Sequence, residues 1–348
     1  MALDPPVKMA NRADLGRRPA TWSLAWQGLG RYDARMFAFR ERRRAGGVAD
    51  IVPVLARQLL TAAAPPSRLP TVRELARQQH SSLSSIHFAI GRLEEAGAVE
   101  IEARGRQGAF MVGRSLSRLW AMAENGRPLV IALPLASSPR YEALATAIKQ
   151  ILTRESMEVF LVFVRGSRQR LEAVRDGRCH LAVMSGFAAS ELCGADDALV
   201  CELPALTYNT GHRVFYKAGA EDQPPPLRVI IDRHSADQQL LTALEFAGQE
   251  VRLVPAMGVQ IARMLAEGHG DAAVWTIDEM RVRWPDGVLD RPLSPAVREQ
   301  VGDRDTRAVL VGRASAAAVL GAVTASIDGA EVEQIQLDVM AGRIVPEY

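Results

Sequence analysis

The chain has 348 residues, of which 48% are hydrophobic and 24% are charged, and its formal net charge is +2. This is the composition of a globular protein, and the length suggests two or three domains. No apolar run reaches the roughly 18 residues of a membrane helix, and the N-terminus lacks the apolar core of a secretory signal. These features exclude a chain built around membrane helices, and we expect a cytoplasmic protein.

The small net charge conceals an asymmetry along the chain. Residues 1–127 contain 20 Lys and Arg against 11 Asp and Glu, a net charge of +9. Residues 128–348 contain 22 against 29, a net charge of −7. Such an asymmetry suggests that the basic part binds a polyanion. Arginine supplies nearly all of the positive charge throughout the chain, so a local abundance of arginine is by itself weaker evidence for polyanion binding than usual.

Residues 1–45 are predicted to form a basic N-terminal extension. They contain the run RERRR at Arg40–Arg44 and two tryptophans, Trp22 and Trp26. The aromatic residues argue against complete disorder, and a short helix or arm could place the basic run along phosphates. The alternative is an ordinary solvated face.

Residues 46–114 have the pattern of three helices followed by a hairpin. Apolar residues recur at helical spacing over 48–63, and Thr71 begins a second helix with a capping box. A third helix follows the polar turn QHSS and ends at Gly97, before two short strands around the tip RGRQG at Arg104–Gly108. This order is that of a winged helix-turn-helix, in which one helix enters the major groove of DNA.

Short hydroxyl and cationic side chains gather at the start of the third helix and at the hairpin tip. Hydroxyls at a helix N-terminus can donate to phosphates or bases, and a basic tip suits a phosphate or the minor groove. We predict that double-stranded DNA is contacted by Thr71, Arg73, Ser81, Ser82, Ser84, Ser85, His87, Arg92, Arg104, Arg106, Gln107 and Gly108. The alternative is a structural helical hairpin that binds a protein.

After a predicted linker at 115–128, strand and helix patterns alternate over 129–348. The strands are LVIALPLA, EVFLVFV, HLAVMSG, LRVIID, VRLV, DAAVW and RAVLVG. Strands that alternate with helices predict an α/β fold with parallel sheets and crossover connections. The two runs of this pattern predict two α/β lobes with a cleft between them.

Polar residues follow several of these strands at their carboxyl ends, where ligands bind in such sheets and helix N-termini point inward. Hydroxyls, backbone N–H groups and arginine suit a carboxylate or a phosphate, so we expect a small anionic effector. The predicted ligand-binding residues are Ser137, Ser138, Tyr141, Arg165, Gly166, Ser185, Arg233, Ser235, Asp237 and Trp275.

Several of these residues have a structural alternative. Ser235 has the position of a helix N-cap, and Asp237 could favour the helix dipole without touching a ligand. Trp275 could belong to the core, and Arg165 could join the lobes in a salt bridge. Tyr141 could lie in a subunit interface.

Patterns of catalytic and cofactor sites are missing from the sequence. It contains no HExxH, GxSxG, P-loop or GxGxxG motif, and its six histidines are scattered. Its three cysteines, Cys179, Cys193 and Cys201, have no CxxC or zinc-ligand spacing. We therefore expect inert thiols, no enzyme activity, no metal and no cofactor.

The segments LPTVRELA and LEEAGAVEIEARGRQGAFMV resemble the GntR-type winged helix in residues and spacing. Arg73 and Gly108 match the pattern of that family. Leu83 and His87 depart from it, because they stand where GntR-type proteins usually carry arginines that contact DNA. The resemblance therefore implies DNA binding but not the common GntR operator sequence.

A second resemblance covers roughly residues 48–348. The segments LPLASSPRYEALA, VRGSRQRLEAVRDG, LAVMSGFAA, DRHSADQ and GHGDAAVW, with the final PEY, resemble the YhfZ subgroup of bacterial regulators. This implies that residues 129–348 form a two-lobe domain of the type II periplasmic-binding-protein fold, which also serves LysR-type regulators.

Together these features predict a regulator that senses a small molecule. We expect it to bind operator DNA as a homodimer, because paired half-sites multiply affinity. Two alternatives remain open. The C-terminal domain could be only an oligomerisation scaffold, or the chain could be an enzyme of the binding-protein fold.

Overall fold

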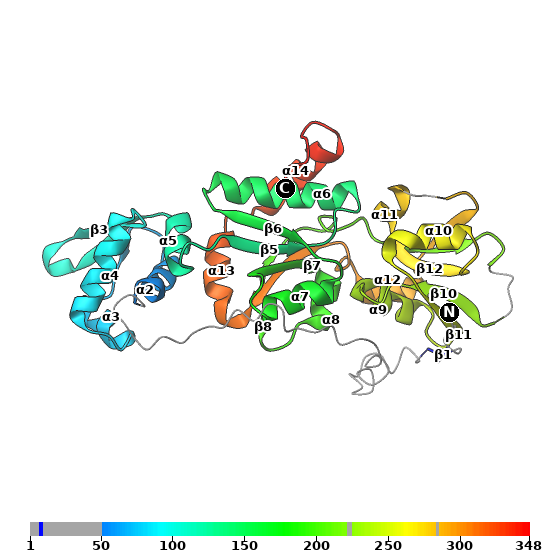
Figure 1. The fold of residues 1–348 in the computed structure, drawn as a ribbon, viewed down its shortest axis with the longest axis horizontal. Helices are drawn as coiled ribbons and strands as arrows, with labels where there is room; N and C mark the ends of the chain where they lie inside the picture. The colour runs from blue at the N-terminus through cyan, green and yellow to red at the C-terminus, as the bar shows by residue number, and fades with distance from the viewer. Residues whose placement is uncertain (1–6, 10–50, 221–224, 283–284) are drawn as a thin grey trace.

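The computed structural model describes residues 7–9, 51–220, 225–282 and 285–348. They form three bodies in a row (Figure 1). We call residues 51–114 the head domain, the sheet-containing body beside it the first lobe, and the body around residues 212–301 the second lobe. Apart from residues 7–9, the predicted extension at 1–45 lies outside the described residues.

The head domain packs three helices against a three-stranded antiparallel sheet of order β2-β4-β3. Its elements are α2 (Ile51–Leu60), β2 (Ser67–Arg68), α3 (Val72–Gln78), α4 (Leu83–Glu95), β3 (Val99–Ala103), η4 (Gly105–Gln107) and β4 (Ala109–Arg114). The capping box predicted at Thr71 is present at the start of α3. Apolar residues at helical spacing meet in the centre, where Leu55, Ile86 and Leu93 are fully buried.

Residues 115–128, expected to form a linker, contain the helix α5 (Leu116–Ala123). Leu119 and Trp120 of α5 are buried, and α5 packs against α2 and against α13 (Ala317–Thr324) of the first lobe. One apolar core runs from the head domain through α5 and α13 into the first lobe. The head domain is therefore joined to the first lobe through packed helices.

The first lobe is a five-stranded sheet of order β6-β5-β7-β14-β8. Helices α6, α13 and α14 cover one face, and α7 and α8 cover the other (Figure 1). Its elements besides α13 are β5 (Leu129–Leu133), α6 (Pro139–Arg154), β6 (Val159–Phe163), α7 (Ser167–Arg175), β7 (Leu181–Ser185), α8 (Gly186–Leu192), β8 (Asp197–Glu202), β14 (Ala308–Arg313), η7 (Ala314–Ala316) and α14 (Gly329–Met340).

The second lobe is a six-stranded sheet of order β1-β11-β10-β12-β9-β13, in which β1 (Val7–Lys8) pairs antiparallel with β11. Separate apolar cores lie on its two faces. Its other elements are β9 (His212–Lys217), β10 (Leu227–Ile231), α9 (Ala236–Glu245), β11 (Glu250–Pro255), η6 (Gly258–Gln260), α10 (Ile261–Ala266), β12 (Ala272–Thr276), α11 (Ile277–Val282), β13 (Val288–Pro292) and α12 (Pro295–Val301).

The chain passes between the lobes twice, at 203–211 and at 302–307, and the two crossover segments hydrogen-bond to each other. The N–H of Tyr208 donates to the carbonyl of Thr306 at 2.8 Å, and the side-chain amide of Asn209 donates to the carbonyl of Asp305 at 3.1 Å. Paired crossovers of this kind form a hinge between lobes. The result is a mixed α/β, two-lobe, binding-protein-like fold.

The expectation of parallel sheets holds only for part of each lobe. β5 pairs in parallel with β6 and β7, and β10 pairs in parallel with β11 and β12. β9, β13 and β14 are antiparallel to their neighbours. β9 and β14 each start just after a crossover, so they enter their sheet from the other lobe without a helical connection that would make them parallel.

Among the described residues, no single helix is long and apolar enough to cross a membrane. One bent pair, residues 314–324 with 329–340, meets the criteria of length and composition when its two helices are taken together.

Candidate functional site

A cavity of about 220 Å³ lies between the two lobes, beside the crossovers. This is the space of about seven water molecules, which suits a small metabolite. The first lobe contributes residues that follow β5 and β6, and the second lobe contributes residues at the ends of β10, β11 and β12. Ligands commonly bind at the carboxyl ends of strands in such sheets. The cavity is therefore where the sequence predicts a binding site.

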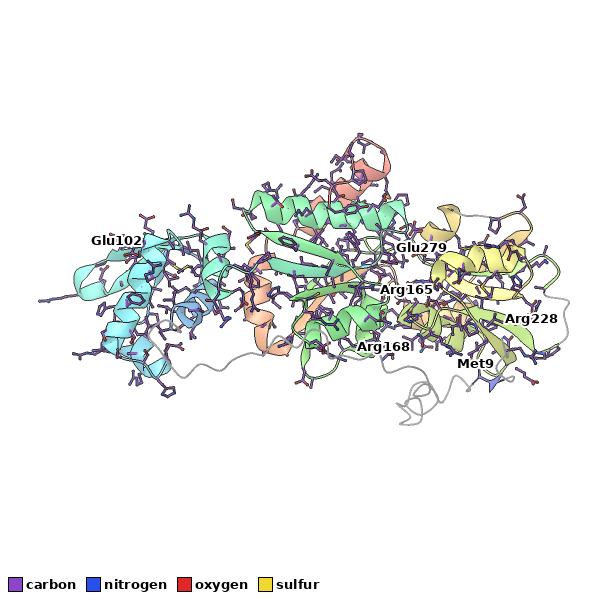
Figure 2. The ribbon with its side chains drawn as sticks, in the orientation of Figure 1. Met9, Glu102, Arg165, Arg168, Arg228 and Glu279 are labelled. Atoms are coloured by element: carbon purple, nitrogen blue, oxygen red, sulfur yellow. The ribbon has the colours of Figure 1, made fainter. Side chains whose placement is uncertain are left out.

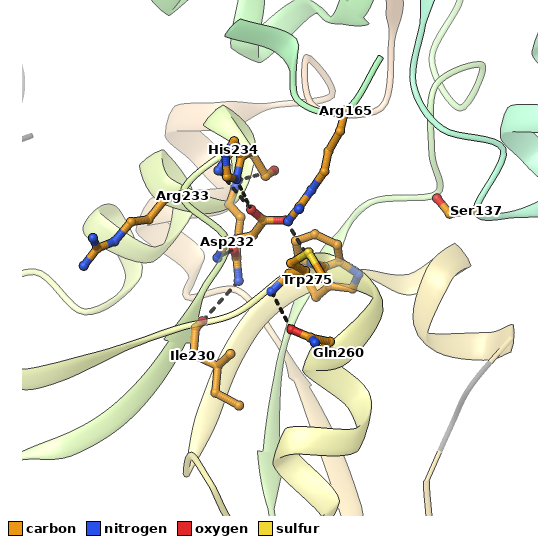
Figure 3. Close-up of polar contacts among 12 residues, drawn as sticks. Ser137, Arg165, Ile230, Asp232, Arg233, His234, Gln260 and Trp275 are labelled. Carbon is orange, nitrogen blue, oxygen red and sulfur yellow. Dashed lines mark hydrogen bonds and ion pairs between the residues drawn. The ribbon is translucent and has the colours of Figure 1, made fainter. Parts of the chain in front are cut away.

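Seven of the ten predicted ligand-binding residues line this cavity: Ser137, Tyr141, Arg165, Gly166, Ser235, Asp237 and Trp275. Three do not. Ser138 and Ser185 are the N-caps of α6 and α8. The side chain of Arg233 points away from the polar group around Asp232 (Figure 3).

An ion pair between the lobes closes one side of the cavity. Nη2 of Arg165, after β6, donates to Oδ2 of Asp232, after β10, at 2.6 Å (Figure 3). Asp232 also accepts the backbone N–H groups of His234 at 2.9 Å and Gly258 at 2.8 Å. The lobe-to-lobe salt bridge considered for Arg165 is thus confirmed. Asp232 was not predicted as a site residue, although its place directly after the strand LRVII was a usable signal.

A second arginine, Arg170 of α7, lines the cavity from a fully enclosed position and is only 2% exposed. Its Nε donates to the carbonyl of Val183 at 2.7 Å, and its Nη1 donates to the carbonyl of Val164 at 2.8 Å. Its Nη2 donates to the hydroxyl of Tyr208, on the first crossover, at 3.0 Å. Arg170 therefore ties strand β7 and the residue that follows β6 to the hinge.

Buried titratable groups meet where the hinge enters the second lobe. The hydroxyl of Ser185 donates to Oδ1 of Asp237 at 2.5 Å, and Nδ1 of His212 lies 2.7 Å from Oδ2 of Asp305. Burial raises the pKa of the Asp237 carboxyl, against the opposing effects of His212 and Ser185. Burial alone would lower the pKa of His212, but the hydrogen bond and charge of Asp305 outweigh it and raise that pKa.

We expect the stability of the protein to fall as the pH rises above 6.5, and we expect His212→Asn to remove that dependence. A histidine whose folded pKa is raised above its usual value of 6.5 stabilises the fold below that value and loses this contribution as the pH rises through the folded pKa. Urea unfolding between pH 5.5 and pH 8 measures it, below the range in which unfolded cysteine thiols ionise. His269→Asn, at an exposed position, is the control and should keep the wild-type profile. Parallel profiles for wild type and His212→Asn would contradict the expectation.

Glu279 of α11 was missed by the sequence analysis, although it lines the cavity. One carboxylate oxygen accepts the hydroxyl of Ser137 at 2.9 Å, and the other accepts the indole N–H of Trp275 at 3.1 Å. The first of these bonds joins the lobes. The acid lies in the first turn of a helix, where a carboxylate is stabilised by the helix dipole, so its sequence position suggested only a structural role.

The three cysteines are free thiols. Burial raises the pKa of Cys179, Cys193 and Cys201, which keeps a thiol protonated and weakly reactive. Within the part of the chain that the structure describes, no group of three or more His, Cys, Asp or Glu side chains could hold a metal ion.

The predicted DNA contacts lie far from the cavity. In Figure 2, Glu102 lies in the head domain at one end of the molecule, whereas Arg165 and Glu279 lie at the junction of the lobes. Ser82 is the N-cap of α4 and accepts the N–H of Ser85. The remaining predicted residues lie on α3, before and on α4, and at the tip between β3 and β4.

Most of the predicted contacts are open to solvent. Thr71, Arg73, Ser82, Ser84, His87, Arg92, Arg104, Arg106 and Gln107 are exposed, and Ser81 and Gly108 are half-buried. Ser85 differs, because it is only 8% exposed and its hydroxyl is 2.8 Å from that of Ser82. Its hydroxyl therefore supports the helix cap and does not face solvent.

The hairpin tip combines positive charge with unusual backbone geometry. Gly105 and Gly108 have φ angles of +53° and +94°, in the left-handed region that favours glycine. Arg104 donates to Glu102 at 2.8 Å, and its guanidinium lies 4.6 Å from the centre of the Phe110 ring. This contact fixes the arginine along the hairpin.

The outer face of α4 also carries large apolar side chains. Leu83 is 47% exposed and Phe88 is 49% exposed, and His87 is exposed between them. Exposed apolar residues beside polar ones on one helix favour a contact surface.

Comparison with known proteins identifies a matching family, a related protein and similar solved structures. Residues 116–348 match the family described as the YhfZ C-terminal domain. The protein YhfZ of Escherichia coli (strain K12) is 31% identical over 228 residues, which cover 65% of this chain and 74% of that protein. The crystal structure of YhfZ from Shigella flexneri is 26% identical, covers 64% of this chain and 93% of that one, and superposes with a TM-score of 0.53. The periplasmic aliphatic sulphonate binding protein SsuA from Escherichia coli is 18% identical over 62% of this chain and 75% of that one, with a TM-score of 0.46.

Proposed function

The chain belongs to the YhfZ C-terminal domain family, and on that premise we propose that it is a cytoplasmic transcriptional regulator without enzyme activity. The head domain would bind operator DNA, and the two lobes would sense a small metabolite. Two features together carry the proposal: an exposed, polar helix start with a basic hairpin tip in the head domain, and a cavity between the two lobes. A continuous packed core links the head domain to the first lobe.

The architecture of the head domain supports DNA binding as a winged helix-turn-helix. Helices α3 and α4 are joined by a short turn, and the β3–β4 hairpin carries Arg104 and Arg106 at its tip. In this arrangement α4 would enter the major groove, with the hairpin tip against a phosphate or the minor groove. Leu83 and Phe88 on α4 suit contact with thymine methyl groups, and His87 suits a base edge.

The cavity supports a small effector with an acidic group. Arg165 lies at one side of it, and the N-terminus of α9, capped by Ser235, faces it. A carboxylate or phosphate there would be stabilised by the guanidinium and by the helix dipole. We propose that such a ligand holds the lobes together, since both lobes contribute its contacts.

A physical route connects the hinge to the head domain. The return crossover at 302–307 leads into β14, and the chain continues into α13, which packs against α2 and α5. A change in the angle between the lobes would therefore move the helices that hold the head domain. In a homodimer this would change the spacing of two head domains and hence the affinity for paired half-sites.

The test is a pull-down of fragmented genomic DNA with the purified full-length protein, followed by sequencing. A sharp peak would support a regulator with a specific operator. Binding without any preferred site, or no binding, would overturn the proposal.

On a fragment recovered in this way, we expect Arg73→Ala with Arg106→Ala to weaken binding and flatten its salt dependence. Each arginine that touches a phosphate releases a counterion, so the slope of log affinity against log salt should fall by about two. A gel shift at four salt concentrations measures the slope. Arg178→Ala, at an exposed position on the first lobe, should leave it unchanged. An equal slope in the double variant would place the DNA contacts elsewhere.

A further inference from the structure

Each of the two lobes is built on a sheet with two edge strands. An unpaired edge presents a row of N–H and C=O groups to other chains, and proteins usually protect it with charged residues, proline, a bulge or a very short strand. Three of the four edges carry such a feature. β1 has two residues, β13 contains Asp290 and Pro292, and β8 shifts its register on β14 and has acidic residues at both ends, Asp197 and Glu202.

The fourth edge strand, β6, has none of these features. Its sequence VFLVF contains no charged residue and no proline, and it pairs with β5 in one unbroken register. Phe160 in this strand is 55% exposed. Among the described residues, β6 pairs with β5 alone (Figure 1), so its outer edge has no strand partner.

The backbone of β6 presents alternate residues to the open side. The carbonyl of Glu158 and the N–H of Val164, which flank β6, both hydrogen-bond to β5. Alternate residues of a strand direct their N–H and C=O groups to opposite sides. The groups of Val159, Leu161 and Phe163 therefore lie on the outer edge.

This outer row is complementary to itself. A two-fold axis pairs identical strands in the antiparallel sense. With the axis at Leu161, this residue faces its own copy, and Val159 faces Phe163 of the partner subunit. These residues all direct their backbone groups outward, so each pair can exchange two hydrogen bonds. At the neighbouring position Phe160 would pack against Val162 of the partner subunit, on the same face of the sheet.

A groove of about 440 Å³ adjoins this edge, with walls from α6, β6 and the last residue of the chain. In it, Nζ of Lys149 donates to the outward carbonyl of Val159 at 2.8 Å, and a carbonyl oxygen has a second lone pair for a strand. The ring of Tyr348 lies 5.1 Å from that of Phe163 and is partly exposed. A stable dimer buries roughly 800 Å² per partner, more than one strand edge offers, and the groove walls supply further surface.

We propose that the protein dimerises through β6, which joins the first-lobe sheets of two copies into one continuous antiparallel-paired sheet. This inference rests on the homodimer of the proposed function and names the surface that forms it. The first lobe shares its core with the head domain, so pairing through β6 holds two head domains relative to each other. The second lobes lie outside the pairing and can move against it.

Sedimentation of the full-length protein over a concentration series measures the dimer. We expect the wild type to dimerise, and we expect Phe160→Asp to raise the dimer Kd at least about tenfold, because each copy would bury a carboxylate. Leu199→Asp is the matched control, since Leu199 is 52% exposed on β8, the other edge of the same sheet. It should dimerise as the wild type does. Circular dichroism checks that both variants fold.

Hydrogen exchange of the wild type tests the interface without a substitution. Outer-edge N–H groups that are unpaired in a monomer are protected when a second strand covers them. We expect exchange in residues 159–163 to become slower as the protein concentration rises. Exchange in residues 197–202, on the opposite edge, should not depend on concentration.

Three results would overturn the inference. These are a wild type that stays monomeric, an unchanged dimer Kd in Phe160→Asp, and slow exchange of β6 at every concentration, which would mean that the same chain covers this edge. A gel shift separates the inference from the regulator itself. A wild-type dimer that binds no DNA would refute the regulator and leave the interface standing. Specific DNA binding by a monomer would refute the interface and leave the regulator standing.

Discussion

The Gly166→Ala variant is expected to hold the two lobes apart and to widen the cavity between them. Gly166 follows β6 at the rim, with a φ angle of +80°. A Cβ at this position would overlap the backbone carbonyl of His234 on the second lobe. A carbonyl of the main chain cannot turn aside as a side chain does, so the second lobe must move. Small-angle scattering of the full-length protein should show a larger radius of gyration.

A matched control separates this effect from backbone strain. Gly219 also has a φ angle of +80°, and nothing lies within 4 Å of a Cβ built on it. Both substitutions place an alanine at a positive φ angle, which strains the backbone, and the strain at Gly166 includes a ψ angle of 134°, outside the left-handed helical region. Gly219→Ala should therefore lower Tm but keep the wild-type radius of gyration. The same radius in all three proteins would show that the contact between Gly166 and His234 does not set the angle between the lobes.

The sequence predicted the fold best where the local residue pattern alone determines a helix or a strand. The strand HLAVMSG is fully apolar in its centre, and β7 is buried along its whole length. The Thr71 capping box begins α3 as predicted. Antiparallel β9 and β14 were not predictable in direction, because their orientation depends on the crossovers that deliver them. Those crossovers are short loops without a periodic pattern.

The position of the candidate site between the lobes was predictable from the sequence, but its acidic residue Glu279 was not. Arg165 and Ser235 were found because they follow strands in the sequence. Glu279 was missed because its role depends on Ser137, which lies 142 residues away in the chain. Its approach to the other lobe comes from the closure of the lobes, which no local pattern records.

Arg170 shows a different kind of failure. Ser167, Arg170, Leu171 and Val174 form the buried face of α7, with the spacing of an amphipathic helix. Because arginine is abundant and usually exposed, this arginine in the buried stripe was not distinguished from its neighbours. An arginine at an otherwise apolar helix position was the available signal.

The largest loss of stability is therefore expected for Arg170→Met. Methionine fills much of the same space but leaves the carbonyls of Val164 and Val183 and the hydroxyl of Tyr208 without their donor. Each buried acceptor left without its donor typically costs about 1–3 kcal/mol, so we expect the three losses together to cost at least about 3 kcal/mol. The pKa of Asp237, which burial raises and Arg170 lowers, should rise further in the variant. Urea unfolding measures the change in the free energy of unfolding.

Arg168→Met is the control, because Arg168 is exposed two residues earlier on the same helix (Figure 2). Surface substitutions away from special features usually change stability by less than about 0.5 kcal/mol. A similar small loss in both variants would mean that the carbonyls of Val164 and Val183 find other donors. A large loss confined to Arg170→Met would instead show that one buried guanidinium fixes the hinge to the first lobe. The first lobe and the hinge would then move as one unit when the cleft closes. Transmission of a ligand signal from the cleft to the head domain requires such a rigid connection.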